Sequence, residues 1–544
     1  MLSQAHFTES PNGILNGLRH LTYSSPIYNY TLIGRMPTRL LGTPPELIPG
    51  NASDGQAFLT GILRFRGRRN SFSSFDTLPG HMNEDCLAYL HGFNWLADLR
   101  QIGSQRARNR VQVLITEWIS LYGQWDSLSW RPDVLGARLA NWTTHFAFFT
   151  ADADRKFIEG VFSELGRQSR HLSRSVLHSE RGRQRIVALK GLIYAGIALP
   201  ESDRYLIQGL GHLEFEISHQ IYPDGGHISR NPTLLMHIMT NLIEIRETLS
   251  AAHIKVPAWL QLTIDRMAPM LRAMRLGDGG LALFNEGIIG EAETIEALLS
   301  KANRRKKVLR AAPHSGFHRL AAGKTVLILD AGAPPKLEAN KWGHAGGLSF
   351  EMSVGKERLI VNCGTARHLG EAWHQVLRTT AAHSTMTVDD VNSAELHRLG
   401  GFKRIPSNVY CSRREIDGKT VIEASTDGYG KPFDLIHRRI LMMSPNGAAV
   451  IGEDQLSGTG GRKYSLRFHL HPNVKATLIQ HGKAALLKPR RGPAWKLAVP
   501  SGNLKLEDSV YLDGPVRLRR SQQVVVSGRI FGRGATVKWR VHSI

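Results

Sequence analysis

The sequence contains little cysteine, few acidic side chains for its length and no long apolar run. Its three cysteines, Cys86, Cys363 and Cys411, are too few and too scattered for a disulfide framework or a cysteine-rich zinc site. No stretch approaches the roughly 18 to 20 uncharged apolar residues that a membrane span needs. The N-terminus also lacks the basic start, apolar run and small-residue cleavage site of a signal peptide. These absences predict a protein without a transmembrane segment that either stays inside the cell or leaves it by another export route.

The shortage of acidic residues makes the protein strongly basic. Its 69 Lys and Arg exceed its 46 Asp and Glu, so the formal net charge is +23. Such a field attracts polyanions, namely nucleic acid, anionic membrane or acidic polysaccharide, and composition does not rank these three. The basic runs at 64–69 and 303–307 come without a helix-turn-helix, zinc-finger or RNA-binding motif. Nucleic acid is therefore not expected as the partner.

The chain has 544 residues, enough for two or three domains. From about residue 83 to 300 the apolar residues recur with the helical period, as in Leu135, Leu139, Trp142, Phe146 and Phe149. The connections between these segments are only a few residues long, which predicts antiparallel helical hairpins in a bundle, a solenoid or a closed α/α toroid. Helices are expected to begin near residues 83, 106, 133, 154, 183, 203, 231 and 257.

After the basic run at 303–307 the period changes from 3.6 to 2. Around residues 348–354, apolar side chains alternate with Ser349, Glu351 and Ser353. Tight-turn signals at 417–418, 446–447 and 513–514 separate strand-like runs. The predicted organisation is an irregular N-terminal arm at 1–82, a helical domain at 83–310 and an antiparallel β-sandwich at 311–544.

The helical half contains a loop that caps one helix and carries two anion-capable side chains. Asn231 is a good N-cap and Pro232 suits the first helical position. A turn with its cap does not account for His227 and Arg230, which precede a helix start whose dipole also favours negative charge. We therefore expect this loop to face a ligand.

Three polar residues of the β half are candidates to lie together at one end of a sheet. His344, Asn362 and His383 each lie where a predicted strand begins or ends. Two imidazoles and an oxygen ligand suit zinc, although Asn is a weaker ligand than Asp. The simpler interpretation is that the two histidines are structural, and the residues alone favour that interpretation.

Four segments of the sequence resemble the heparinase II/III-like family, polysaccharide lyases built from an α/α toroid and a C-terminal sandwich. They are DGGHISRNP at 224–232, GHAGGLSFEMSVGKERLIVNCG at 343–364, AAHSTMTVDD at 381–390 and FHLHP at 468–472. The resemblance implies a multidomain α+β protein, with an N-terminal α/α toroid of helical hairpins followed by an antiparallel β-sandwich. It also implies an acidic polysaccharide partner and a place in the cell envelope or periplasm, whereas the missing signal peptide leaves the cytoplasm open.

The family's chemistry is β-elimination at a uronic acid. One group neutralises the carboxylate, a Tyr or His removes the C5 proton, and an acid assists the leaving oxygen. The sequence departs from the family at positions where active members carry catalytic or zinc-binding residues. Arg183 and Gln184 stand where active members carry Asn or Asn-His, Leu234 where they carry Tyr, Trp342 where they carry His, and Asn362 where they carry the zinc Asp.

Two interpretations follow from these departures. In a divergent lyase, Arg183 neutralises the carboxylate and Tyr222 or His227 supplies the base. Alternatively, the chemistry has been lost and the protein binds acidic polysaccharide without cleaving it. The lyase is the main prediction, with zinc as its only expected cofactor and no signal for an oligomeric state. Its expected catalytic residues are Arg183, Tyr222, His227, Arg230 and His344, its substrate contacts Gln184, Asn231, Trp342 and Arg378, and its metal ligands His344, Asn362 and His383.

Overall fold

The structure, a computed structural model, describes residues 17, 19, 21–303, 306–335, 339–500, 502–514 and 518–544. The chain divides into two compact units. The first comprises Met1–Ile217 and Asn241–Leu260, and the second comprises Ser218–Thr240 and Gln261–Ile544. Among the described helices, none is long and apolar enough to cross a membrane.

The predicted irregular arm contains two helices and a hairpin among irregular stretches; its part before residue 17 lies outside the described residues. It forms α2 (Pro26–Thr31), α3 (Ala52–Leu59) and a hairpin of β1 (Ile62–Phe65) with β2 (Arg68–Ser71). Asn51 caps α3 by accepting hydrogen bonds from two backbone amides. The basic run at 64–69 makes the hairpin turn, because Arg66 and Gly67 both adopt positive φ. Irregular backbone occupies the proline-containing stretch between α2 and α3 and residues 72–83 before α4.

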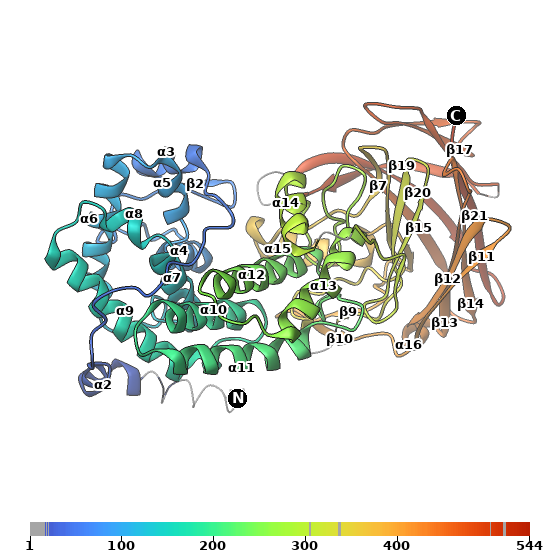
Figure 1. Cartoon of the computed structure of the whole chain (residues 1–544). Helices are drawn as coiled ribbons and strands as arrows, with labels where there is room; N and C mark the ends of the chain where they lie inside the picture. The colour runs from blue at the N-terminus through green and yellow to red at the C-terminus, as the bar shows by residue number, and fades with distance from the viewer. Residues whose placement is uncertain are drawn as a thin grey trace, which may run out of the picture. The chain divides into compact units, whose positions relative to one another are not determined.

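Helices follow one another as the apolar period predicts, and each expected start lies within a residue of an observed one (Figure 1). Most consecutive helices are joined by short connections, in keeping with the predicted hairpins, but longer segments at 221–231 and 274–291 precede α12 and α14. The bounds are α4 (Glu84–His91), α5 (Leu96–Ile102), α6 (Gln105–Tyr122), α7 (Pro132–Thr144), α8 (Phe146–Thr150), α9 (Arg155–Ser175), α10 (Arg183–Ala198), α11 (Asp203–Gln220), α12 (Pro232–Ala251), α13 (Ala258–Ala273) and α14 (Ala292–Ala302).

A close contact between α7 and α10 depends on two glycines. A Cβ at Gly191 would lie 2.2 Å from the carbonyl oxygen of Gly136, so only glycine allows the two backbones to approach this far. The predicted apolar stripe packs into the first unit at this level, with Leu135, Leu139 and Trp142 fully buried. A side chain larger than hydrogen at either glycine would separate the helices.

The second unit contains two antiparallel sheets that form the predicted sandwich. One sheet has eight strands in the order β11-β12-β13-β14-β21-β18-β17-β16. The other has nine, in the order β19-β20-β15-β7-β6-β5-β4-β3 with β8 paired to β15. The eight-stranded sheet consists of β11 (Val409–Ile416), β12 (Lys419–Tyr429), β13 (Leu435–Met443), β14 (Ala449–Gly458), β16 (Lys475–Ile479), β17 (Ala484–Lys488), β18 (Trp495–Ala498) and β21 (Gly534–Ser543). The nine-stranded sheet consists of β3 (Ala311–Ala312), β4 (Phe317–Ala322), β5 (Thr325–Asp330), β6 (Phe350–Val354), β7 (Glu357–Val361), β8 (Met386–Val388), β15 (Lys463–Leu470), β19 (Leu504–Tyr511) and β20 (Arg519–Arg529).

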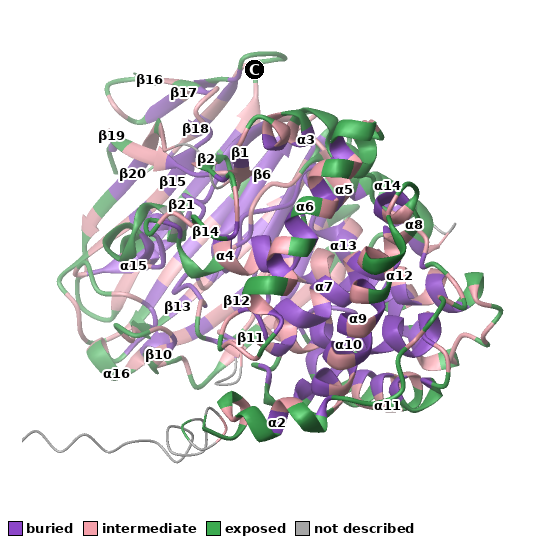
Figure 2. Ribbon diagram, turned by 90° about the vertical axis from the view of Figure 1, so that its left-hand side faces the viewer, coloured by how far each residue is buried: buried purple, intermediate pink, exposed green. Residues whose placement is uncertain are grey.

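The inward side chains of the two sheets make one core. Phe350 of β6 stacks on Trp539 of β21 with ring centroids 5.7 Å apart, and Phe468 of β15 meets the same indole edge-on at 5.0 Å. Burial alternates along β13, β14 and β21, so each of these strands turns one face to the core and the other outward (Figure 2).

Strand β6 differs from this pattern because both of its faces are buried. The sequence alternates apolar with polar residues there, yet Glu351 and Ser353 are as inaccessible as Phe350. The segment that follows α13 covers the outer face: Gly277 N donates to Ser353 Oγ at 2.9 Å and Leu283 N donates to Glu351 Oε2 at 3.1 Å. Burial raises the pKa of Glu351 to about 7, against the attraction of Arg358.

Candidate functional site

The loop between α11 and α12 is held by its own polar side chains. His227 is buried; its Nε2 lies 3.1 Å from Gln220 Oε1, and its Nδ1 accepts the Ser229 amide at 3.0 Å. Burial lowers the pKa of His227 to about 3, so the ring is neutral at physiological pH. The expectation that His227 faces a ligand is not supported, because both ring nitrogens are used within the loop.

Arg230 fastens the same loop to the sandwich. Its guanidinium forms a buried ion pair with Asp330, Nε donates to Ser315 O at 2.7 Å and one terminal nitrogen donates to Ala333 O at 2.9 Å. The group also lies 4.8 Å from the ring centroid of Phe317. An arginine so fully engaged is a structural tie, which corrects its assignment as a catalytic or ligand-facing residue.

The capping prediction for this loop is confirmed. Asn231 Oδ1 accepts the amides of Thr233 and Leu234 at 2.8 and 3.0 Å, and α12 begins at Pro232. Its side-chain oxygen is therefore committed to the helix start. Tyr222, also in the loop, is half-buried; desolvation raises the pKa of its hydroxyl, with Arg230 opposing that effect.

A short segment after α13 connects the loop to the glycine-rich motif at 343–347. Asn285 donates through its amide to Arg230 O at 3.2 Å and accepts the His344 amide at 3.0 Å. Asn285 and Glu286 both have positive φ, 46° and 69°. These φ values lie in the left-handed region, which strains any residue that has a Cβ. Two consecutive such residues persist only where surrounding contacts fix them.

Glu286 is the centre of a buried polar network, and no sequence prediction identified it. One carboxylate oxygen lies 3.1 Å from His344 Nε2 and 3.0 Å from His374 Nε2, and the other accepts the Thr365 hydroxyl at 2.6 Å. Burial alone would raise the pKa of Glu286, but the hydrogen bonds from His344 and His374 outweigh it and hold the pKa below its ordinary value. The available sequence signal was weak: an Asn-Glu-Gly turn at 285–287 after an apolar run.

The protons of this network can be assigned by its partners. His383 Nδ1 donates to Thr379 O at 2.7 Å, which leaves its Nε2 to accept from His344 Nδ1 at 3.1 Å. His344 Nε2 then faces Glu286 Oε1, a contact that requires one shared proton between them. Both nitrogens of His344 are thus occupied, so its predicted catalytic role is not supported by this geometry.

The structure brings His344 and His383 together as the sequence predicts, but in a geometry that does not fit zinc. The two rings hydrogen-bond to each other instead of converging on a common point. Asn362 turns its oxygen to the Ser384 amide at 3.0 Å and its nitrogen to Leu283 O at 3.4 Å. Among the described residues, no group of three or more His, Cys, Asp and Glu could hold a metal ion.

Of the predicted substrate contacts in this unit, Trp342 is half-buried and Arg378 is inaccessible. Arg367 lies 4.1 Å and Lys341 5.1 Å from the ring centroid of Trp342, so the indole carries two cations. Arg378 donates to Gly343 O and Gly401 O at 3.0 and 2.9 Å. The assignment of Arg378 as a substrate contact is therefore corrected to a backbone tie.

Arg183 and Gln184 belong to the first unit and begin α10. The segment before them is fixed by the buried Glu216, which accepts the Gly182 amide at 3.1 Å and lies 3.4 Å from Arg185 Nη1. Arg183 is exposed and has no ion pair among the described residues, and Gln184 is half-buried. Of the five predicted catalytic residues, Arg183 is the most accessible to a ligand.

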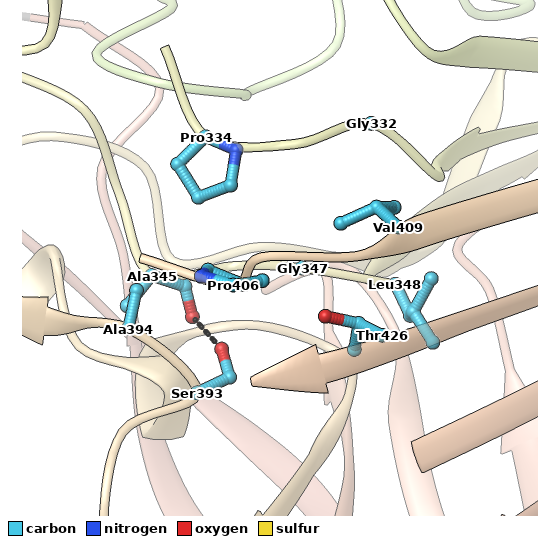
Figure 3. A pocket seen from close by; sticks show the side chains of 10 residues that line it. All are labelled: Gly332, Pro334, Ala345, Gly347, Leu348, Ser393, Ala394, Pro406, Val409 and Thr426. Carbon is cyan, nitrogen blue, oxygen red and sulfur yellow. Dashed lines mark hydrogen bonds between the residues drawn. The ribbon is translucent and has the colours of Figure 1, made fainter. Parts of the chain in front are cut away.

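A small pocket lies next to the glycine-rich motif (Figure 3). Ser393 Oγ donates to Ala345 O across it at 3.2 Å. No described lining residue is charged, so the pocket does not provide the carboxylate-binding group that an acidic sugar requires. Its lining consists of Gly332, Pro334, Ala345, Gly347, Leu348, Ser393, Ala394, Pro406, Val409 and Thr426.

Comparison with known proteins gives consistent matches along most of the chain. The heparinase II/III N-terminus model matches residues 104–306, and the heparinase II/III-like C-terminal model matches residues 304–540. FtsZ-localized protein C of Caulobacter vibrioides is 28% identical over 532 residues, which are 93% of this chain and 90% of that protein.

Solved structures share the fold at low sequence identity. Heparinase III has a TM-score of 0.73 at 12% identity, with 98% of this chain and 91% of that chain covered. A heparan sulfate lyase from Pedobacter heparinus has 0.65 at 16%, covering 98% and 90%. A chondroitin AC lyase from Streptomyces coelicolor A3 has 0.57 at 10%, covering 96% and 80%.

Proposed function

Because the chain belongs to the heparinase II/III-like family and has the fold of its polysaccharide lyases, we propose that it binds an acidic polysaccharide without cleaving it. The observation that carries this proposal is the state of the predicted catalytic side chains. His227, Arg230 and His344 are buried and use their polar atoms within the protein. A shared fold does not require a shared reaction, so these site residues decide the question.

β-Elimination needs a base that can take the C5 proton. His227 is a weak base because burial lowers its pKa to about 3. The pKa of Tyr222 is raised by desolvation, so its hydroxyl is ionised even more rarely than an ordinary tyrosine. His344 is already hydrogen-bonded at both nitrogens. The ring nitrogens of His227 and His344 are already engaged, and desolvation disfavours the phenolate form of Tyr222.

Binding needs accessible cations instead, and these are present. Arg183 is exposed at a helix start without a carboxylate partner among the described residues. Arg367 is exposed on the face of Trp342. Guanidinium groups bind carboxylate and sulfate oxygens through paired hydrogen bonds. The name of the relative from Caulobacter likewise refers to localisation rather than to an activity. Location in the cell envelope remains a prediction of the family resemblance.

The purified full chain should be mixed with heparin, chondroitin sulfate and polyuronates at rising salt. We expect binding that weakens as salt rises, because exposed charges are screened over about 10 Å at 0.1 M salt. We also expect no growth of the ultraviolet absorbance of an unsaturated uronate product. Salt-independent binding or no binding to every polymer would contradict the proposal.

A matched pair of variants sharpens this test. Arg183→Ala should weaken binding several-fold at low salt, whereas Arg106→Ala, which removes an exposed arginine from α6, should leave it within about twofold. Product absorbance that appears with the wild type and disappears with Arg183→Ala would overturn the binder and establish a lyase.

A further inference from the structure

One end of the eight-stranded sheet carries several basic side chains and no acidic one on its outward face. The strands concerned are β16, β17, β18 and β21, which are hydrogen-bonded neighbours (Figure 2). None of these four strands contains an Asp or Glu. They belong to the last 70 residues, 475–544, which contain 14 Lys and Arg but only 3 Asp and Glu.

The strand register places the cations together. Leu487, Trp495 and Leu497 face the core, as do Trp539 and Val541. Because side chains alternate along a strand, their neighbours in sequence all face outward. We name this outward set the basic stripe: Lys475, Lys488, Lys496, Arg540 and His542.

The register also sets like charges directly opposite one another. Lys475 pairs with Lys488 across β16 and β17, and Lys496 pairs with His542 across β18 and β21. Desolvation, together with the charges of Arg540 and Lys496, lowers the pKa of His542, so its ring is uncharged at physiological pH and only the Lys475–Lys488 pair opposes two cations. Directly opposed like charges destabilise a sheet, so folding alone gives no reason for this arrangement.

At the other end of the same sheet, outward side chains of opposite charge are paired. There Glu423 on β12 accepts from Arg414 on β11 at 3.0 Å and from Arg438 on β13 at 2.8 Å. In the described parts of the chain, no member of the basic stripe has an ion pair with a carboxylate, whereas Lys538, the other outward cation of β21, lies 3.6 Å from Glu453 on β14. The directly opposed Lys475 and Lys488 thus lack the carboxylate partner that Arg414 and Arg438 have.

We infer that the basic stripe is a second contact surface for a linear acidic polysaccharide. This inference rests on the proposed function and adds a site far along the chain from Arg183. The stripe runs obliquely over four adjacent strands about 4.8 Å apart, because Lys496 faces Leu486 and Lys488 lies two residues further along β17. An extended polymer lying obliquely across the strands meets a Lys or Arg on each of them. Charge on one polymer spans the stripe and screens the opposed pair that destabilises the free protein.

The composition of the face favours a sugar polymer over other polyanions. Its remaining outward residues include Thr477, Leu486, Ala498 and Thr536, and no aromatic side chain projects among them. Single-stranded nucleic acid binding ordinarily uses aromatic platforms on which bases stack. A single line of cations also suits a linear polymer better than the two-dimensional surface of an anionic membrane.

The test uses the full chain and the double variant Lys488→Glu with Lys496→Glu. Its affinity for heparin, measured by calorimetry at 0.1 M salt, should fall at least tenfold, with a shallower dependence on salt. Lys419→Glu is the matched control: Lys419 is exposed on the outward face of β12 at the other end of the sheet and pairs with Ile416. That control should stay within about twofold of the wild type.

Thermal unfolding separates loss of the site from loss of the fold. Lys488→Glu places opposite charges at the Lys475 pair, so its Tm should equal or exceed that of the wild type while its affinity falls. If the wild type and the double variant bind heparin equally, the basic stripe is not a contact surface, and the proposed function is left intact. A wild type that binds no acidic polysaccharide would overturn the proposed function. Loss in the double variant of binding to DNA or to phosphatidylserine vesicles alone would assign the stripe to that partner instead.

Discussion

The buried network around Glu286 and the exposed basic stripe differ in whether their charged groups have partners within the protein. Glu286 satisfies both oxygens with His344, His374 and Thr365. The stripe sets Lys475 against Lys488 on a solvent-facing sheet. The first arrangement is what stability requires of a buried carboxylate, whereas the second opposes stability. Charges that the fold does not use are therefore the better guide to what this protein binds.

This contrast explains why residues with family-like motifs make poor candidates for chemistry here. His227, Arg230 and His344 occupy the motifs that carry the family resemblance, and each uses its polar atoms in contacts within the protein. Their positions maintain the shared fold. The proposed binding relies instead on exposed cations such as Arg183 and Arg367, which have no ion pair with a carboxylate among the described residues.

The largest effect expected is on stability, from the buried tie that the loop makes to the sandwich. Arg230→Ala leaves Asp330 buried without its partner and should lower the free energy of unfolding by about 3 to 5 kcal/mol. Urea unfolding monitored by tryptophan fluorescence measures this. Arg266→Ala, which removes an exposed arginine from α13 in the same unit, should cost less than about 1 kcal/mol.

If Arg230 contacted substrate instead, Arg230→Ala would leave stability nearly unchanged and reduce polysaccharide binding. Adding Asp330→Asn to Arg230→Ala tests whether the unpaired Asp330 carboxylate causes the loss of stability. Removing the orphaned charge should recover part of the loss, because the unpaired carboxylate is what the single variant leaves behind.

The next largest effect is on the pH dependence of stability, in which the buried His227 should differ from the more exposed His542. The folded-state pKa of His227 is about 3, below its unfolded value of about 6.5. The unfolded chain therefore binds this proton first, so stability is present above pH 6.5 and is lost as pH falls toward 3, by about 1.4 kcal/mol per pH unit. His227→Gln should flatten the pH dependence of the unfolding free energy between pH 6.5 and 4.5, measured by urea titration.

His542→Gln is the control for this measurement. His542 is half-exposed on the sheet and should change the slope much less. A slope equally insensitive to both substitutions would mean that the His227 ring is accessible to protons in the folded protein.

The sequence predicted the architecture closely because local signals agreed with the tertiary structure. The period of apolar residues and the Asn231-Pro232 cap place helix starts within a residue of the observed ones. Proximity of His344 and His383 was also predicted correctly. Strand β6 was harder, since its polar residues suggested an outer face in water whereas the segment 277–283 covers them.

The candidate site was less predictable because its partners come from distant segments. Glu286 receives hydrogen bonds from residues 58, 79 and 88 positions further along the chain. No local period or cap encodes such pairings. The basic stripe was equally hidden: Lys475 and Lys488 become neighbours only through the register of β16 and β17. Composition revealed the excess charge, and only the fold shows where it accumulates.

The smallest expected effect tests whether the stripe really opposes stability. Lys475→Glu and Lys488→Glu should each stabilise the fold by a few tenths of a kcal/mol at low salt, because each creates an opposite-charge pair. The double reversal restores a like-charge pair, so its stability should return toward that of the wild type. Urea unfolding of the four proteins gives the coupling energy. Additive effects, or a coupling unchanged at 1 M salt where charges are screened within about 3 Å, would show that the two ammonium groups avoid each other and that the stripe costs the fold nothing.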